Sequence, residues 1–130
     1  MKFTATQTGK LSGPGFTARC VLGKGGVVTA SQKREGDGAS PAGVWLYNRP
    51  VSLPFAASHE KLWRDDHVYD VIVELGYNDD PVEPGRGSAI FMHVARPNFE
   101  PTEGCVALER EDLLALLEMM LPDTEIEISF

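Results

Sequence analysis

Two segments in the middle of the chain have the hydrophobic patterns of β-strands, one alternating and one apolar on both faces. Between Tyr69 and Leu75 the odd-numbered positions are apolar, and between Ser88 and Ala95 both faces are mostly apolar. The first pattern predicts a half-buried strand, and the second predicts a central strand that is covered on both faces. Shorter segments of the same character predict further strands at 16–22, 27–29, 44–47 and 125–130.

Glycine and polar residues mark the connections between these strands. A glycine-rich turn between 16–22 and 27–29 predicts that the two segments form a hairpin. The polar, glycine-rich stretch 31–43 is expected to be a loop, and a short helical turn is expected at 58–63. The chain has 13 glycines and 9 prolines. This density of strand-breaking residues favours a domain rich in short strands.

One segment has the periodicity of a helix. Leucine and methionine residues recur at spacings of three and four between Leu113 and Leu121, and the resulting apolar stripe is expected to face the core. Acidic residues gather at the start of this segment, where the helix dipole favours negative charge, and Pro122 follows its end. The sequence therefore predicts one clear helix, at 109–121, in a mainly β domain.

Length and composition are those of a single soluble globular domain covering 1–130. The chain has 130 residues, of which 42% are hydrophobic and 24% charged, and a chain of this size buries a core without disulfides or a structural metal. Its formal net charge of −7 argues against nucleic acid or an anionic membrane surface as a partner, since both need a concentrated basic surface. The oligomeric state is left open.

The sequence carries neither a membrane-spanning segment nor a recognisable export signal. Its apolar runs are shorter than the roughly 18 residues that a spanning helix needs. Residues 1–7 lack the apolar core of a signal peptide. The sequence as written is compatible with a cytoplasmic location, or with export by a leader that it does not include.

Two cysteines, Cys20 and Cys105, are too few for a disulfide framework or a cysteine-only zinc site. Cys20 is expected to be a small buried residue. Cys105 directly follows Gly104, where a glycine removes a blocking side chain and allows a tight turn. Such a turn aims backbone N–H groups at one point, as an oxyanion hole requires, and the helix that follows favours a thiolate. Cys105 is therefore a candidate nucleophile, with a buried cysteine after a turn glycine as the alternative.

His93 is the candidate base. A histidine is the usual partner of a nucleophilic cysteine because its ordinary pKa lies near working pH. His93 lies on an otherwise apolar predicted strand, and a loop-like segment with two prolines connects it to Cys105. The strand and the returning loop are able to bring the two side chains together. The alternative is a core histidine whose hydrogen bonds are satisfied.

These two residues belong to a longer pattern. His93 is followed by a loop and then by Thr102 to Leu108, which reads Thr-Glu-Gly-Cys-Val-Ala-Leu. This arrangement resembles the catalytic motif of the L,D-transpeptidase (YkuD) family, in which a histidine precedes Ser/Thr-x-Gly-Cys and an apolar residue. The segment 33–43 resembles the family's strand-to-loop segment that ends in a Thr/Ser-Pro-x-Gly turn. The resemblance extends over roughly 16–128, and two further segments, 63–70 and 76–78, resemble a branch of small bacterial YkuD-like proteins.

The sequence departs from the family pattern at three points. Glu103 stands where the family usually has a histidine before Gly-Cys, and Ala107 stands where it often has Asn or Arg. The loop between His93 and Thr102 is also shorter than usual. These departures bear on substrate choice and turnover more than on the nucleophile.

The resemblance implies a fold and a reaction. The fold is a mainly β, mixed sandwich or barrel-like domain with one helix in its C-terminal half. In the reaction, Cys105 attacks the carbonyl after the L-centre of a peptidoglycan stem tetrapeptide, forms a thioester and releases the terminal D-residue. The acceptor is the amine of a second stem in an L,D-transpeptidase, or water in an L,D-carboxypeptidase. His93 acts as general base and later acid, and the N–H groups of Gly104 and Cys105 form the oxyanion hole. No metal or cofactor is implied.

Three further residues are candidates for binding that substrate. Arg96 and Arg86 carry guanidinium groups, whose geometry suits a carboxylate, although solvated surface positions are the alternative for both. Thr102 is expected either to contact substrate or to shape the turn before Gly104. Because peptidoglycan lies outside the cytoplasm, the implied location is the periplasm or cell envelope if the protein is exported.

Two other functions compete with catalysis by Cys105. The first is a non-catalytic module that binds cell-wall peptide with the same fold, which the changes at Glu103 and Ala107 would allow. The second is a metallohydrolase, although its spacing matches no zinc motif such as His-Glu-x-x-His. Its ligands would come from His59, Asp65, Asp66, His67 and His93.

Overall fold

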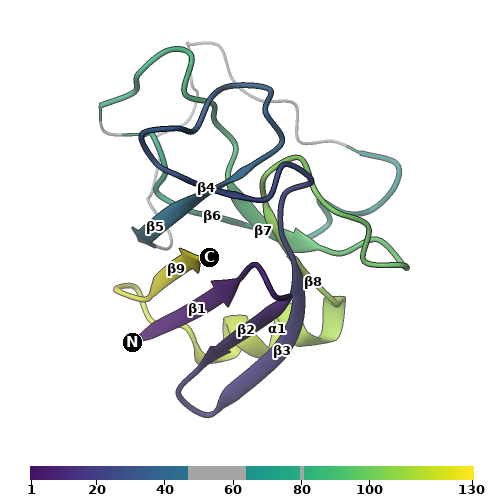
Figure 1. Cartoon of the computed structure of the whole chain (residues 1–130). Helices are drawn as coiled ribbons and strands as arrows, with labels where there is room; N and C mark the ends of the chain where they lie inside the picture. Colours follow the sequence, from purple (N-terminus) through teal and green to yellow (C-terminus); the bar gives the residue numbers. More distant parts are fainter. Residues whose placement is uncertain (47–63, 80) are drawn as a thin grey trace, which may run out of the picture.

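A computed structural model of the chain describes residues 1–46, 64–79 and 81–130 (Figure 1). The helical turn expected at 58–63 lies outside these residues. The described residues form nine strands and one helix. In chain order these are β1 Lys2–Thr6, β2 Lys10–Gly13, β3 Phe16–Val21, β4 Val27–Thr29, β5 Ser40–Leu46, β6 Ile72–Glu74, β7 Phe91–Val94, β8 Val106–Leu108, α1 Arg110–Met119 and β9 Glu125–Ser129. The expectation of a mainly β domain with one helix is confirmed.

All nine strands belong to one mixed sheet, in the order β4-β5-β9-β1-β2-β3-β8-β7-β6. The sheet curls into a half-barrel, so that β1 to β3 lie at one end of the molecule and β4 to β7 at the other (Figure 1). Neighbouring strands are parallel at β4–β5, β1–β9 and β7–β8, and antiparallel elsewhere. The parallel β7–β8 pair matters most here, because β7 carries His93 and β8 begins directly after Cys105.

The centre of the sheet is built from the two ends of the chain. β1 pairs in parallel with β9, with Phe3 opposite Ile126 and Ala5 opposite Ile128. All four side chains are almost completely buried, on the same face of the two strands. Neither β1 nor β2 is among the strands predicted from the sequence, although Phe3 and Ala5 alternate with polar neighbours in the same way as the predicted strands.

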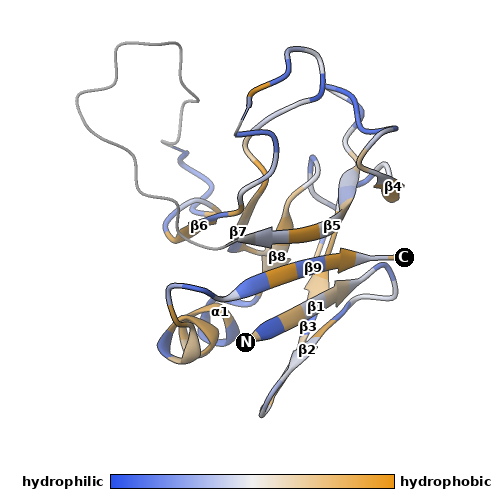
Figure 2. Cartoon of the chain, turned by 90° about the vertical axis from the view of Figure 1, so that its left-hand side faces the viewer, coloured by the Kyte–Doolittle hydropathy of each residue, from blue (hydrophilic) through white to orange (hydrophobic). Residues whose placement is uncertain are grey.

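Helix α1 covers one end of the curled sheet (Figure 2). It buries Leu113 and Leu116 completely, as the apolar stripe predicted. The helix is shorter than the expected 109–121 because the residues at both of its ends, Glu109 and Met120, have extended backbone with ψ of 144° and 136°. Among the described residues, no helix has the length and apolar character needed to cross a membrane.

Two expectations about the first half of the chain are wrong. The segments 16–22 and 27–29 do not form a hairpin: β3 pairs with β2 and β8, whereas β4 pairs with β5 at the far edge of the sheet. The stretch 31–43 is not entirely loop, because β5 begins at Ser40. β3 and β5 each have one neighbour that lies far away in the chain, β8 for β3 and β9 for β5, and a local pattern of turn residues cannot reveal such pairing.

Two other predicted strands are correctly placed but too long. The strand expected at 69–75 is confined to β6, because Tyr69 and Asp70 belong to a turn closed by a 3.2 Å hydrogen bond from Asp70 N–H to the carbonyl of His67. The strand expected at 88–95 begins only at Phe91, since Ala89 has a φ of +56°, which no strand residue adopts.

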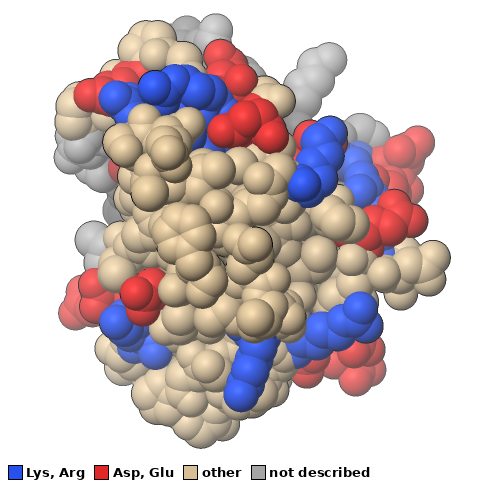
Figure 3. Space-filling view, in the orientation of Figure 1, with Lys and Arg blue, Asp and Glu red and all other residues tan. Residues whose placement is uncertain are grey.

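Charged side chains are dispersed over the surface. In the view of Figure 3, Lys and Arg lie among Asp and Glu around the edges of the molecule, and the middle of this face is largely uncharged. The described part of this face therefore carries no continuous basic surface of the kind that binds a nucleic-acid backbone.

Candidate active site

The register of β7 and β8 brings His93 and Cys105 to the same face of the sheet. In this parallel pair His93 lies opposite Ala107. Cys105 is two residues before Ala107, so its side chain points to the same side of β8. Cys105, directly before β8, is thus a diagonal neighbour of His93 on β7, offset by about 7 Å along the strand direction.

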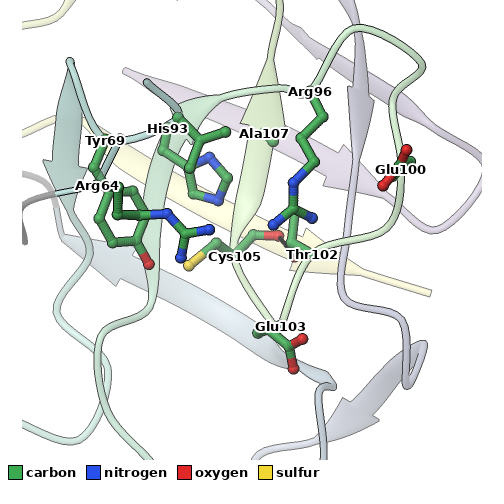
Figure 4. Close-up of a pocket in the computed structure, with 10 residues that line it drawn as sticks. Arg64, Tyr69, His93, Arg96, Glu100, Thr102, Glu103, Cys105 and Ala107 are labelled. Atoms are coloured by element: carbon green, nitrogen blue, oxygen red, sulfur yellow. Dashed lines mark hydrogen bonds between the residues drawn. The ribbon is translucent and has the colours of Figure 1, made fainter. Parts of the chain in front are cut away.

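A pocket opens at this face, and Figure 4 shows the side chains that surround it. Of the residues predicted from the sequence, the pocket brings together Cys105, His93, Thr102 and Arg96. The full lining consists of Arg64, Val68, Tyr69, His93, Arg96, Glu100, Thr102, Glu103, Cys105 and Ala107. Glu103 and Ala107, the two departures from the family motif, therefore both border the pocket.

The turn before Cys105 depends on Thr102 and Gly104. Thr102 Oγ1 donates a 2.7 Å hydrogen bond to the carbonyl of Cys105 and accepts a 3.1 Å bond from the N–H of Gly104. Gly104 has a φ of +134°, and a Cβ at this position would lie 2.7 Å from the carbonyl oxygen of Ala39. Only glycine fits both the conformation and this close approach. Thr102 thus shapes the turn before Cys105, which is one of the two roles predicted for it.

Ser40, which the sequence analysis did not select, fixes this turn to the rest of the sheet. Its side chain is fully buried, and its Oγ donates a 2.7 Å hydrogen bond to the carbonyl of Gly104. The same oxygen accepts a 2.9 Å bond from the N–H of Gly23. Ser40 is the first residue of the Ser-Pro-x-Gly sequence. The family resemblance therefore included this residue, but it did not indicate what the Ser40 hydroxyl binds.

The thiol of Cys105 is held as a neutral, buried group. Its Sγ donates a 3.1 Å hydrogen bond to the carbonyl of Ala89 and accepts a 3.4 Å bond from the N–H of Phe91. Burial raises the pKa of Cys105 to about 11, against the smaller opposing effects of the Phe91 N–H and of the positive charges on Arg64 and Lys33. At neutral pH the group is therefore a thiol, and its proton must be removed before or during nucleophilic attack.

One hydrogen bond orients the imidazole ring of His93. Its Nδ1 lies 2.9 Å from the carbonyl of Val94, which can only accept a hydrogen bond. This contact assigns the proton of the neutral ring to Nδ1 and leaves Nε2 as an acceptor. Burial lowers the pKa of His93, and the bond to Val94 only partly offsets this effect. The backbone carbonyl of Val94 is thus the orienting group that the sequence was unable to name.

Charged side chains surround the pocket on several sides. Arg64 and Arg96 line it, and both form ion pairs with Asp66. Glu100 and Glu103 line it as well, and Glu103 is paired with Lys24 at 2.9 Å. Arg64 was not singled out by the sequence analysis, since a lone arginine in a polar segment has no distinguishing pattern.

Arg86, the other arginine predicted to bind substrate, lies elsewhere. It lines a second pocket together with Trp45, Tyr77 and Glu83. Its Nε forms an ion pair with Glu83, and its backbone carbonyl accepts a 2.7 Å hydrogen bond from the Tyr77 hydroxyl. These contacts give Arg86 a structural role in the loop that precedes β7.

The remaining candidates are placed as follows. Cys20 is buried, as expected, and forms no disulfide, and burial raises its pKa to about 11. No group of three or more potential ligands that could hold a metal occurs among the described residues. His67 and Asp70 form an exposed ion pair, and His59 lies outside the described part of the chain.

Comparisons with known proteins point to one family. The family model of the L,D-transpeptidase catalytic domain, YkuD, matches residues 5–128. No curated protein sequence gives a significant match. Among solved structures, the cell-shape-determining protein Pgp2 of Campylobacter jejuni is similar to 98% of this chain, with a TM-score of 0.65 and 15% identity. L,D-transpeptidase 1 of Mycobacterium tuberculosis is similar to 99% of the chain, with a TM-score of 0.54 and 15% identity. The chain covers only 46% and 61% of these two proteins.

Proposed function

Because the chain belongs to the family of L,D-transpeptidase (YkuD) catalytic domains, we propose that it is a cysteine acyltransferase that acts on peptidoglycan stem peptides. One observation carries this proposal: His93 on β7 and Cys105, directly before the parallel neighbour β8, line the same pocket. The chemistry of a neutral thiol beside a neutral imidazole is that of general-base-assisted nucleophilic attack.

The reaction has two halves. In the first, the Sγ proton of Cys105 passes to Nε2 of His93 while Sγ attacks the donor carbonyl carbon. The C–N bond to the terminal residue then breaks, the leaving amine takes the proton from His93, and a thioester remains on Cys105. In the second half, an amine or water attacks the thioester, His93 accepts its proton, and the proton returns to Sγ as the C–S bond breaks.

The resting geometry requires one movement before attack. The Sγ–H of Cys105 donates to the carbonyl of Ala89 rather than to His93. Donor binding therefore has to be accompanied by rotation of the thiol from Ala89 towards Nε2 of His93. Catalytic hydrogen bonds often form only in the substrate complex, so the resting contact is compatible with catalysis.

The turn at Gly104 supplies the oxyanion hole in this proposal. The Gly104 N–H already donates to Thr102 Oγ1, so the N–H of Cys105 is the better candidate of the two predicted donors. A backbone N–H that is fixed by a rigid turn stabilises the developing negative charge without reorganisation. The hydrogen bonds of Thr102 and Ser40 provide that rigidity.

A binding module remains the second candidate function, and one observation favours it. The thiol is buried, protonated and hydrogen-bonded away from His93, as a cysteine without a catalytic role would be. The two functions differ in their products, because a binding module retains stem peptide without forming a thioester.

Intact-mass spectrometry after incubation with a carbapenem or a stem tetrapeptide tests the proposal. A single adduct is expected on the native chain and none on Cys105→Ala, while His93→Gln forms it at least about 100-fold more slowly. Circular dichroism shows whether each variant is folded. Stem-peptide binding without any adduct on folded, reduced protein would exclude the acyltransferase and favour the binding module.

The compartment is part of the proposal. Peptidoglycan stems are assembled into the wall outside the cytoplasm, so the proposed site of action is the periplasm or cell envelope. A cytoplasmic form would instead act on stem peptides recovered from the wall. Fractionation of cells followed by immunodetection of the protein distinguishes the two locations.

A further inference from the structure

The Cys105 pocket is flanked by two arginines that approach it from different parts of the chain. Arg64 precedes β6, and Arg96 follows β7. Figure 4 shows their guanidinium groups directed towards the centre of the pocket from opposite sides, with His93 and Cys105 between them. Their side chains are 36% and 39% exposed, so both are accessible to a ligand.

One carboxylate, Asp66, links the two cations. Arg64 contacts it through a two-point fork, in which Nε lies 2.9 Å from Oδ1 and Nη2 contacts Oδ2. Nη2 of Arg96 lies 3.7 Å from the same Oδ2. These positive charges keep the pKa of Asp66 well below its usual range. Two cations and one permanent anion leave this group with one net positive charge, although the whole chain carries −7.

This positive charge lies close to the reacting atoms. Arg64 contributes to lowering the pKa of Cys105, and both arginines contribute to lowering the pKa of His93. The fork to Asp66 uses Nε and Nη2 of Arg64, so Nη1 takes no part in it. Of the two acidic residues that also line the pocket, Glu103 is already paired with Lys24.

We propose that Arg64 and Arg96, positioned by Asp66, bind the free C-terminal carboxylate of the residue that leaves the acyl donor. This inference rests on the proposed function, because it assigns a subsite for that donor. A guanidinium group pairs with a carboxylate through charge-assisted hydrogen bonds, and Nη1 of Arg64 lies outside the fork to Asp66. The subsite makes the enzyme selective for donors that have only one residue, with a free carboxylate, after the scissile bond.

Arg64 also has a structural contact that the test must separate from recognition. Its guanidinium group lies 5.1 Å from the ring centroid of Tyr69, and the Tyr69 ring packs 5.3 Å from the ring of His93. Loss of Arg64 is therefore able to disturb His93 through Tyr69. Such a disturbance affects every donor equally, whereas loss of a carboxylate subsite affects only donors with a free carboxylate.

The experiment compares a stem tetrapeptide that has a free C-terminal carboxylate with the same peptide as its C-terminal amide. Binding of each is measured by calorimetry on Cys105→Ala, which cannot be acylated, and on the same chain with Arg64→Gln or Arg96→Gln added. Arg110→Gln is the matched control, since Arg110 forms a similar exposed pair with Asp70, at 2.9 Å, and does not line the pocket.

The acid is expected to bind about 10- to 100-fold more tightly than the amide to the Cys105→Ala chain, as a charge-assisted contact predicts. Arg64→Gln and Arg96→Gln should each reduce this ratio several-fold, and Arg110→Gln should leave it unchanged. Three outcomes would overturn the subsite. The first is an acid-to-amide affinity ratio that is unchanged in both arginine variants. The others are a ratio near one in the Cys105→Ala chain, or no binding of either peptide to that chain.

Acylation of the chain with Cys105 intact separates the two proposals. If both peptides acylate Cys105 at the same rate, the acyltransferase stands and the carboxylate subsite is wrong. If neither acylates it but the acid still binds more tightly than the amide in an Arg64-dependent way, the subsite stands and the proposed reaction is wrong.

Discussion

The hydroxyl of Ser40 donates a 2.7 Å hydrogen bond to the carbonyl of Gly104, the residue directly before the candidate nucleophile. The two residues are 64 positions apart in the sequence. Because Ser40 also accepts a hydrogen bond from the N–H of Gly23, its single side chain joins the end of β3, the start of β5 and the turn at Cys105. The turn that carries Cys105 is thus tied through Ser40 to two other segments of the sheet.

Ser40→Ala is expected to destabilise the fold and to slow acylation of Cys105. The substitution leaves the buried carbonyl of Gly104 and N–H of Gly23 without partners, at a cost of about 1–3 kcal/mol. Denaturant unfolding measures the stability, and adduct formation with a carbapenem measures the rate under conditions where both proteins are folded. Ser40→Thr keeps the hydroxyl and should restore the rate at least in part. Normal acylation by folded Ser40→Ala would show that the hydrogen bond does not position Cys105.

Gly104→Ala is expected to abolish acylation and to lower stability. The φ of +134° is unfavourable for alanine, and the added Cβ would lie 2.7 Å from the carbonyl oxygen of Ala39. Strain of this kind costs on the order of 1–3 kcal/mol. Gly36→Ala is the matched control, because Gly36 has a φ of +79° but no atom within 4 Å of the added Cβ. Equal effects of the two substitutions in unfolding and acylation would mean that the close approach at Gly104 is unimportant.

Acylation should depend on pH through the lowered pKa of His93. At neutral pH the imidazole is uncharged, since burial lowers its pKa below the usual value of 6.5. As pH falls through that lowered pKa, His93 takes up a proton and is no longer able to accept one from Cys105, so the rate falls. The rate of adduct formation, followed from about pH 4 to pH 9, should therefore decline only below pH 6.5. A decline that begins above this value would contradict a buried, neutral base.

His93→Gln should make the reactivity of Cys105 depend on the ionisation of its own thiol. Without the base, reaction depends on the thiolate of Cys105, whose pKa of about 11 keeps it scarce at neutral pH. The rate of alkylation by iodoacetamide should then rise about tenfold per pH unit up to the pKa of the thiol. A plateau near pH 8 would show that the thiol is already ionised and needs no base.

Arg96→Ala and Arg86→Ala should separate two residues that the sequence could not distinguish. Arg96 lines the Cys105 pocket, whereas Arg86 lines the second pocket beside Tyr77 and Glu83. We expect Arg96→Ala to lower the kcat/KM for a stem-peptide donor about 10-fold or more, because a charged contact with the donor is lost. We expect Arg86→Ala to change the same kcat/KM by less than about twofold. A larger effect at Arg86 than at Arg96 would place the donor in the second pocket.

The sequence by itself determined the local elements and the chemical groups. Alternation of side chains located the centres of β6, β7 and β9, and the leucine stripe located α1, because burial on one face imposes a period on the residues of a single element. Cys105 and His93 stood out because a thiol after a glycine and a histidine among apolar residues lack a simpler explanation. The motif around them indicated the family, and the family model agrees.

Only the tertiary structure decided which segments pair. The expected hairpin of 16–22 with 27–29 failed because β3 pairs with β2 and with the distant β8, whereas β4 pairs with the next strand, β5. Pairing of distant strands is governed by the fit of their buried faces, which no single segment encodes.

Long-range strand pairing also determined which residues surround the Cys105 pocket. Cys105 and His93 share a face because β7 and β8 pair in parallel in one register, and a shift by one residue would have separated them. Ser40 reaches Gly104, and Arg64 reaches the pocket, through folding of segments that resemble the family in sequence but do not reveal these contacts. The sequence specified the reactive groups, whereas long-range packing selected the residues that hold and surround them.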